Sequence, residues 1–314
     1  MPPEIRLSIV SPVFRAAPLV DDLVMLVANA AALVTQDFEI ILVDDASEDE
    51  SWARITAAAE RDPRVKGILL SRNFGQHHAI TAGLANARGE HVIVMDCDLQ
   101  DDPRYIPALV AKAEEGFDVV ATRRERRQSW IRKLGAALFF HVYNALADNR
   151  PADSGVSGYS LITRKVVDSF LRINDAHRQY LMIINWMGFR HAIIPVNRLS
   201  RPAGRSSYNL RRLVRLGLAG ITSQSNRLLH VAVAIGFIYV AAAAIGIACL
   251  VAGYLSHGYL QGWASTIVLL LGSTGLILLG LGILGIYLGN VFDQVRGRPL
   301  YLVRDYRNFK QPPL

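Results

Sequence analysis

The stretch VIVMDCDLQDDP, residues 92–103, is the starting point, because an apolar run there ends abruptly in carboxylates. Residues 92–95 have the composition of a buried β-strand. Aspartate is a poor strand residue and is seldom buried without a partner, so the aspartates that follow need an explanation. They are Asp96, Asp98, Asp101 and Asp102. The stretch is either a solvated turn or one wall of a site that binds a positively charged group.

Strands and helices are predicted to alternate around this stretch. The strands are expected at residues 6–14, 38–45, 65–71, 90–96 and 117–123, and the helices at 18–34, 48–60, 76–87 and 103–115. Ser47 is a candidate N-cap for the second helix, and Asp102 followed by Pro103 fits the start of the fourth. Continuous apolar strands separated by helices predict an α/β fold, with a mainly parallel sheet and helices on both faces.

Polar motifs follow the predicted strands at 11–14, 44–47, 71–75 and 96–98. Ligands of such sheets bind at the carboxyl ends of the strands. The first strand is not followed by G-x-G-x-x-G or G-K-[ST], which argues against a standard dinucleotide or P-loop site. Asp96 and Asp98, one residue apart, can present hard oxygens to Mg²⁺ or Mn²⁺ that bridges a diphosphate. Asp44 and Asp45 could hold a base or ribose by hydrogen bonds.

The charge and the cysteines narrow the class of protein. A formal net charge of +7 and a pI near 9.6 fit nucleic acid, anionic lipid or phosphorylated substrates. Cys97 and Cys249 lack metal-ligand spacing and predict no disulfide framework, so a reducing compartment is expected. The N-terminal residues lack the basic start and long apolar stretch of a signal peptide.

Two apolar segments near the C-terminus predict membrane spans. Residues 228–254 and 266–288 are each long enough to cross about 30 Å of hydrocarbon. A pair of buried helices in a soluble bundle is the alternative. Arginines precede the first segment and follow the second, while the connecting loop has neither lysine nor arginine, which predicts that both termini face the cytoplasm. These arginines are Arg211, Arg212, Arg215, Arg227, Arg296, Arg298 and Arg304.

The motifs SIVSPVF, VDDASEDES, SRNFGQHHA and MDCDLQDDP together resemble those of the family 2 glycosyltransferases with a GT-A fold. Later stretches narrow the resemblance: VATRRERR, SGYSLITRKVVD, RPAGRSSYNLRRLVRL and YLGNVFDQVRGRPLYLVRD. They are similar to the polyprenyl-phosphate glycosyltransferases, such as dolichyl-phosphate mannose synthases, bactoprenol glucosyltransferases and the aminoarabinose transferases of lipid A modification. The resemblance covers nearly the whole chain.

The resemblance implies transfer of a sugar from a nucleotide sugar to a polyprenyl phosphate, with Mg²⁺ or Mn²⁺ as cofactor. Asp96 and Asp98 would be the D-x-D pair, with Asp98 the direct metal ligand, and Gln100 and Asp101 would lie near the sugar. The nucleotide would be lined by Pro12, Phe14, Asp44, Asp45, Ser71, Asn73 and Asp96. The residues near the diphosphate or the acceptor phosphate would be Arg123, Arg127, Arg201, Arg205, Ser206, Tyr208, Arg211, Arg212 and Arg215.

The resemblance also implies an organisation and a location. Residues 1–205 would be the GT-A catalytic domain, 206–227 an amphipathic interfacial helix, 228–290 two membrane helices and 291–314 a cytoplasmic tail. The protein would be a multi-pass protein of the inner (plasma) membrane with its catalytic domain in the cytoplasm. Its partners would be membrane lipids and its two substrates, with no nucleic acid, and a homo-oligomer such as a tetramer is one arrangement.

The chemistry of the acceptor bears on the need for a base. A phosphate monoester is already anionic near neutral pH, since its second pKa is about 6. Its oxygen could attack the anomeric carbon directly, with inversion, while the metal and arginines stabilise the departing nucleoside diphosphate. Some family members have an acid before the aromatic residue at position 159, where this chain has Gly158. Asp153 is the nearest carboxylate, and the identity of a general base stays open.

Alternatives remain at this stage. A UDP-sugar is favoured as donor and GDP-mannose is the alternative, while the acceptor favoured is undecaprenyl phosphate. A sugar nucleotidyltransferase would need a glycine-rich basic loop after the first strand, and a processive synthase would need Q-x-x-R-W and more spans. A non-catalytic membrane-anchored nucleotide-sugar-binding or scaffold protein is the alternative of another class. The arginine cluster could serve topology alone, and His77 and His78 are expected to pack rather than bind ligands.

Overall fold

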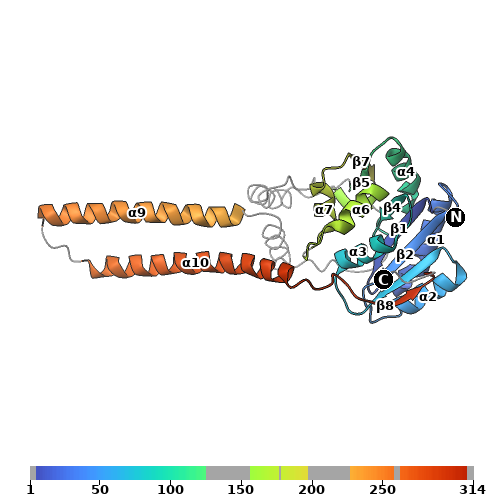
Figure 1. Cartoon of the computed structure of the whole chain (residues 1–314), viewed down its shortest axis with the longest axis horizontal. Coiled ribbons are helices and arrows are strands. Elements are labelled where there is room, and N and C mark those ends of the chain that lie inside the picture. Colours follow the sequence, from blue (N-terminus) through green and yellow to red (C-terminus); the bar gives the residue numbers. More distant parts are fainter. Residues whose placement is uncertain (1–4, 125–155, 177, 197–226, 258–261, 310–314) are drawn as a thin grey trace. The chain divides into compact units, whose positions relative to one another are not determined.

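The computed structural model describes residues 5–124, 156–176, 178–196, 227–257 and 262–309 (Figure 1). The chain divides into two compact units, one built on a β-sheet and one on two long helices. The strands are β1 (Leu7–Val13), β2 (Phe38–Asp44), β3 (Val65–Leu70), β4 (His91–Val94), β5 (Val119–Arg124), β6 (Val156–Thr163), β7 (His191–Val196) and β8 (Val303–Arg307). The helices of the first unit are η1 (Ala17–Leu19), α1 (Val20–Ala32), α2 (Ser51–Arg61), α3 (Gln76–Asn86), η2 (Pro103–Tyr105), α4 (Ile106–Glu114), α6 (Arg164–Arg172) and α7 (Tyr180–Trp186).

The described strands form one sheet in the order β7-β5-β6-β4-β1-β2-β3-β8. Strands β4, β1, β2 and β3 are parallel neighbours. Strand β6 runs antiparallel between β4 and β5, and β8 runs antiparallel to β3 at one edge. The mixed, mostly parallel α/β sheet confirms the predicted fold class. It also brings the carboxyl ends of β1 to β4 to one edge, where ligands of such sheets bind.

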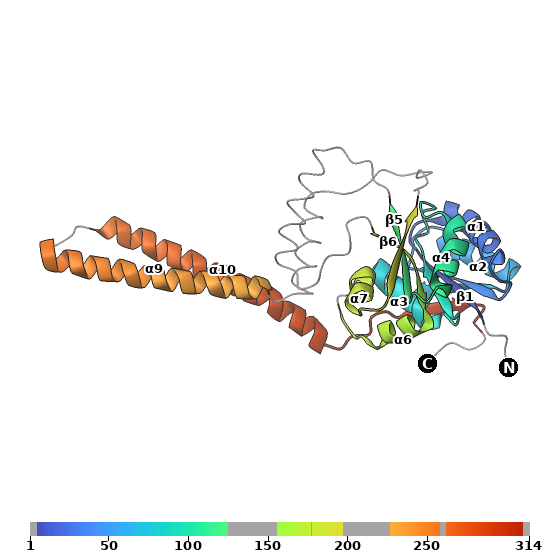
Figure 2. The same ribbon diagram turned by 90° about the horizontal axis from the view of Figure 1, so that it is seen from above.

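Helices cover both faces of the sheet (Figures 1 and 2). Side chains of α1, α2 and α4 form one core with Ile9, Leu42 and Ile93, while those of α3, α6 and α7 form another with Val10 and Val43. Successive residues of a strand point to opposite faces, so a strand covered on both sides is apolar throughout. This explains the continuous apolar runs in the sequence.

Two helix starts show where local prediction succeeds and where it fails. The Asp102 carboxylate accepts a hydrogen bond from the Arg104 N–H (3.0 Å), and Pro103 is the first residue of η2, so that predicted cap is confirmed. The Ser47 cap is wrong, because α2 begins at Ser51. The Ser47 hydroxyl instead accepts from the Arg15 N–H (3.0 Å), which ties the loop after β2 to the loop after β1.

The second unit contains α9 (Arg227–His257) and α10 (Trp263–Val295), which lie side by side in both views (Figures 1 and 2). The Tyr239 hydroxyl of α9 donates to the Leu269 carbonyl of α10 (3.4 Å). Within the described residues, length and composition qualify one stretch to cross a membrane, Gly272–Val295; the apolar stretch of α9, Val231–Gly246, is shorter. The structure thus supports one spanning helix, and the expected two-span hairpin is not shown.

Candidate functional site

The D-x-D pair lies in the loop between β4 and η2, at the carboxyl edge of the sheet. The Gln76 side-chain amide donates to Asp96 (2.6 Å), and Asp98 accepts from the Gln100 N–H (3.1 Å). Leu99, between Asp98 and Gln100, has a left-handed backbone (φ 55°), which bends the loop tightly. Each carboxylate has several lone pairs, so these hydrogen bonds leave both able to bind a cation.

The donor set of this loop fits a hard divalent cation. No cluster of three or more histidine, cysteine, aspartate or glutamate side chains suited to a metal occurs in the described part of the chain. A metal at this loop would therefore take its remaining ligands from substrate and water. Mg²⁺ is commonly bound in this way, by one or two carboxylates together with substrate phosphates.

Cys97 lies between the two carboxylates and is an unreactive residue. Burial raises the pKa of its thiol to about 12, and the charges of Asp96 and Asp98 act in the same direction. The thiol is therefore protonated near neutral pH and is a poor nucleophile. The side chain packs against the core that α1, α2 and α4 share with the sheet, which gives it a structural role.

Asp101 and Asp102 have local partners. Asp101 is 4% exposed, and its carboxylate accepts from the Asp96 N–H (3.3 Å). Asp102 caps η2 as described, and its carbonyl accepts from the buried Tyr159 hydroxyl (3.2 Å). At Gly158, a β-carbon would meet no atom of the described residues within 4 Å. The place where some relatives were expected to have an acid is thus open space.

Asp44 is the last residue of β2 and Asp45 follows it, but the two carboxylates differ in their hydrogen-bond partners. The Asp45 carboxylate accepts from the Phe74 N–H (2.7 Å) and the Gly75 N–H (2.8 Å), so it holds the loop before α3. One oxygen of Asp44 accepts from the Ser47 N–H (2.8 Å), and the other, Oδ2, is buried and has no partner among the residues that the structure describes. Burial raises the pKa of both carboxyl groups.

The other predicted donor residues lie at the same edge. Pro12 is buried near the end of β1, while Phe14 just after it is exposed beneath the Arg15 guanidinium (5.2 Å from the ring centre). Ser71 and Asn73 are exposed in the loop after β3. The Ser71 N–H donates to the Leu302 carbonyl (2.8 Å), so this loop is joined to the chain just before β8.

Some of the buried polar atoms that have no partner among the described residues lie at or near this edge. They include Ser11 Oγ, Asp44 Oδ2 and Gln100 Oε1, each of which has no hydrogen-bond partner in the described part of the chain. Such atoms are uncommon in folded proteins, because burying a polar group without a partner costs free energy. Three strand-end loops also contain a left-handed residue that is not glycine, namely Arg15, Ala46 and Leu99. Both features are typical of ligand sites.

Two histidines that were expected to pack do so. His77 Nδ1 accepts from the Tyr180 N–H (3.4 Å), and burial lowers the pKa of both His77 and His78. His77 thus acts as a neutral acceptor that joins α3 to α7, which is a structural role.

The predicted basic residues are placed only in part. Arg123 is exposed at the end of β5, on the same edge as the β4 loop. The other candidates lie outside the described residues, and their roles stay predictions. They are Arg127, Asp153, Arg201, Arg205, Ser206, Tyr208, Arg211, Arg212 and Arg215.

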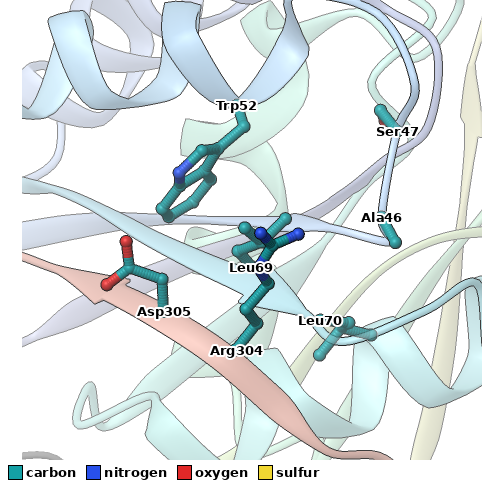
Figure 3. Close-up of a pocket in the computed structure, with 7 residues that line it drawn as sticks. All are labelled: Ala46, Ser47, Trp52, Leu69, Leu70, Arg304 and Asp305. Carbon is teal, nitrogen blue, oxygen red and sulfur yellow. The ribbon is translucent and has the colours of Figure 1, made fainter.

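The structure adds a pocket that sequence reasoning missed. A cavity of about 400 Å³ lies beside the loop after β2, and Trp52, Leu69, Arg304 and Asp305 are among the residues lining it (Figure 3). Its outer wall is β8, from the segment that was expected to be only a tail. The apolar residues Val303, Tyr306 and Phe309 of this segment recur every third position and not every second, so the local pattern did not predict a strand.

The comparisons with known proteins agree with this fold. Residues 8–171 match the family model Glycosyl transferase family 2. An uncharacterized glycosyltransferase of Bacillus subtilis, YkcC, is 32% identical over 96% of this chain and 94% of its own length. The undecaprenyl-phosphate 4-deoxy-4-formamido-L-arabinose transferase of an Enterobacter species is 31% identical over 95% of this chain and 93% of its own length.

A solved structure shares the fold. Glucosyl-3-phosphoglycerate synthase from Mycobacterium tuberculosis, solved with Mn²⁺, uridine diphosphate and phosphoglyceric acid, superposes with a TM-score of 0.51 at 19% identity over 69% of this chain and 76% of that one. The fold, the acidic strand-end loop and the sequence matches define a nucleotide-sugar glycosyltransferase. The chain belongs to glycosyl transferase family 2.

Proposed function

We propose that the protein transfers a sugar from a nucleotide sugar, preferably a UDP-sugar, to a polyprenyl phosphate, preferably undecaprenyl phosphate. The observation that carries the proposal is the carboxyl edge of the sheet, where Asp96 and Asp98 follow β4 and buried polar atoms have no partner among the described residues. The Enterobacter relative, whose name specifies undecaprenyl phosphate, supports the acceptor, because its similarity extends beyond the catalytic domain.

Asp98 and Asp96 would hold Mn²⁺ or Mg²⁺, which would neutralise the charge of the departing nucleoside diphosphate. The side chains of the protein would position the donor sugar and the acceptor phosphate. The Gln100 amide lies two residues from Asp98, and its unpartnered oxygen suits a hydroxyl of the donor sugar. The acceptor phosphate brings its own negative charge, so its oxygen can attack the anomeric carbon without a strong base. Arg123 and the arginines of the 197–226 segment would hold the acceptor phosphate at the membrane surface.

The membrane anchor fits a lipid acceptor. The stretch Gly272–Val295 would span the bilayer, α9 would complete a hairpin with both chain ends on the cytoplasmic side, and residues 206–227 would lie in the interface. A homo-oligomer would pack through the glycines and alanines of these helices.

The test is reconstitution. Purified full-length protein with Mn²⁺ and undecaprenyl phosphate is incubated with a panel of UDP- and GDP-sugars, and the glycolipid and the released nucleotide are measured. We expect UDP release that depends on both the metal and the lipid. Release of GDP instead would make the protein a mannose-type synthase. Nucleotide binding without any transfer would support the non-catalytic scaffold and overturn the proposal.

A further inference from the structure

The C-terminal strand β8 is built into the sheet by several contacts. It pairs with β3 along Gly67 to Leu70, and the Asn308 side chain donates to the Val65 carbonyl (2.8 Å). The Lys66 ammonium lies 5.3 Å from the centre of the Phe309 ring. These contacts fix β8 on the outer edge of the sheet, next to the loops that end β2 and β3.

A register shift in β8 changes the direction of one side chain. Asp305 pairs with Leu69 and Val303 pairs with Leu70, so Arg304 is an extra residue between the two pairs. Such a β-bulge redirects side chains and is frequent next to active sites. Arg304 and Asp305 consequently both line the cavity together with Leu69 (Figure 3).

The register also connects this cavity to Asp44. Cross-strand pairs join Val13 to Asp44, Asp44 to Leu69 and Leu69 to Asp305. Paired residues of neighbouring strands point to the same face of a sheet. The cavity therefore lies on the sheet face to which Asp44 points, and Ala46 and Ser47 of the next loop line it.

The chemistry of the lining suits a flat, neutral ring. Trp52 offers an aromatic surface and Leu69 an aliphatic one, while the planar Arg304 guanidinium has no hydrogen-bond or ion-pair partner within the described residues. Asp305 is paired with Arg307 (2.8 Å). Arg304 is the one cation among the described lining residues, and the Arg307 guanidinium, paired with Asp305, lies 5.6 Å from the centre of the Trp52 ring, so one positive charge is left without a carboxylate there. A phosphate would need more positive charge than this.

We propose that this cavity holds the nucleobase of the donor, with Arg304 donating to a carbonyl oxygen of the base and Trp52 contacting its ring. The inference rests on the proposed function and makes the C-terminal strand a wall of the donor site. A guanidinium only donates hydrogen bonds, which favours the keto bases uracil and guanine.

Strand β3, on which the cavity lies, is three strand spacings, about 14 Å, from β4 and the D-x-D loop. An extended nucleotide sugar suits this separation.

The experiment measures binding with full-length protein, MnCl₂, UDP, GDP and the free nucleosides uridine and guanosine. Isothermal titration compares wild type with Arg304→Ala and Arg304→Lys. Arg88→Ala is the matched control, since Arg88 is also an exposed arginine but lies beside the amino ends of the strands. We expect Arg304→Ala to weaken the preferred nucleotide and its free nucleoside by the same factor, about tenfold, because one charge-assisted hydrogen bond is lost. Arg304→Lys should recover little of the loss, since lysine lacks the planar fork, and Arg88→Ala should change neither ligand.

Other outcomes overturn the inference. Weaker UDP binding with unchanged uridine binding would assign Arg304 to a phosphate. Equal binding of every ligand by wild type and Arg304→Ala would show that the cavity is not used by the base. A lowered thermal midpoint in Arg304→Ala would make the residue structural. A protein that binds nucleotide through Arg304 but glycosylates no undecaprenyl phosphate would refute the proposed acceptor and leave this inference standing.

Discussion

Near its amino end, β2 presents Glu39, and at its carboxyl end it presents Asp44. The Glu39 carboxylate is 1% exposed and accepts from the Ser8 hydroxyl (2.6 Å), the Arg88 N–H (2.7 Å) and the Lys66 ammonium. The equally buried Asp44 has one oxygen without a partner among the described residues. The two carboxylates lie on one strand, on opposite faces of the sheet, and are equally buried, so burial alone does not separate them. What separates them is how completely the protein satisfies their oxygens.

The difference is that between a structural and a ligand-binding polar group. Around Glu39 the hydrogen bonding is dense, because Ser8 in turn accepts from the Gly89 N–H (2.8 Å). At the carboxyl edge of the sheet, Asp44, Ser11 and Gln100 each have a buried atom with no partner in the part of the chain that the structure describes. Unpaired groups of this kind lower stability and are retained where a ligand completes them. Substitutions at the two ends should therefore change different properties.

The largest effect is expected at the amino end. Glu39→Ala removes the partner of Lys66, which is only 9% exposed, and leaves a buried charge. The free energy of unfolding should fall by about 3–5 kcal/mol, measured by denaturant or thermal unfolding of the full-length protein. The double variant Glu39→Met with Lys66→Met removes both charges and should recover most of that loss. A single variant as stable as wild type would show that this cluster does not hold the fold together.

The next effect is expected in the D-x-D loop and concerns activity. Asp98→Ala should lower sugar transfer by about 10²–10³-fold, because the carboxylate that would hold the cation at the leaving diphosphate is lost. Asp98→Asn keeps an acceptor for the Gln100 N–H and should be nearly as inactive. The thermal midpoints of both should stay close to that of wild type. A fall in thermal midpoint as large as that expected for Glu39→Ala would show that Asp98 stabilises the fold, and it would contradict the proposed difference between the two edges of the sheet.

A smaller effect is expected at Gln100. Its buried Oε1 has no partner in the described part of the chain, so Gln100→Met should leave the unfolding free energy nearly unchanged. Transfer should fall by about tenfold if the amide contacts the sugar. The two quantities are measured on one preparation, by thermal unfolding and by initial rates. Unchanged rates would mean that the unpaired oxygen has no part in binding the donor.

Sequence patterns were sufficient for the parts of the fold that depend on local periodicity. Helices α1, α3 and α4 and strands β1 to β5 lie where apolar spacing predicted them, and the Asp102–Pro103 helix start is confirmed. Strands β6, β7 and β8 were missed because their positions depend on long-range pairing. Strand β8 pairs with residues more than 230 positions earlier in the chain, as Gly67 with Arg307. No local pattern contains that information.

The candidate site divides in the same way. Residue types and spacing indicated the acidic loop, but they could not distinguish Asp44 from its neighbour Asp45. The Phe74 and Gly75 amides satisfy Asp45, while Asp44 keeps a free oxygen. That distinction depends on where the loop before α3 lies. Arg304 was noted only as a topology-setting charge, since a β-bulge is not visible in the sequence.

Asp44 therefore gives the smallest and most direct test of the comparison. Its folded-state pKa is raised by burial, so above that pKa the folded state carries the cost of a buried charge that the unfolded state avoids. Asp44→Asn keeps an acceptor for the Ser47 N–H and removes the charge, so its thermal midpoint near pH 7 should equal or slightly exceed that of wild type. As the pH falls through the raised pKa toward 3.8, wild type becomes protonated and the difference should disappear. Donor affinity should fall meanwhile, because the oxygen offered to the ligand has lost its charge. If Asp44→Asn is instead strongly destabilised near pH 7, as Glu39→Ala is expected to be, the carboxylate serves the fold and the two ends of β2 do not differ.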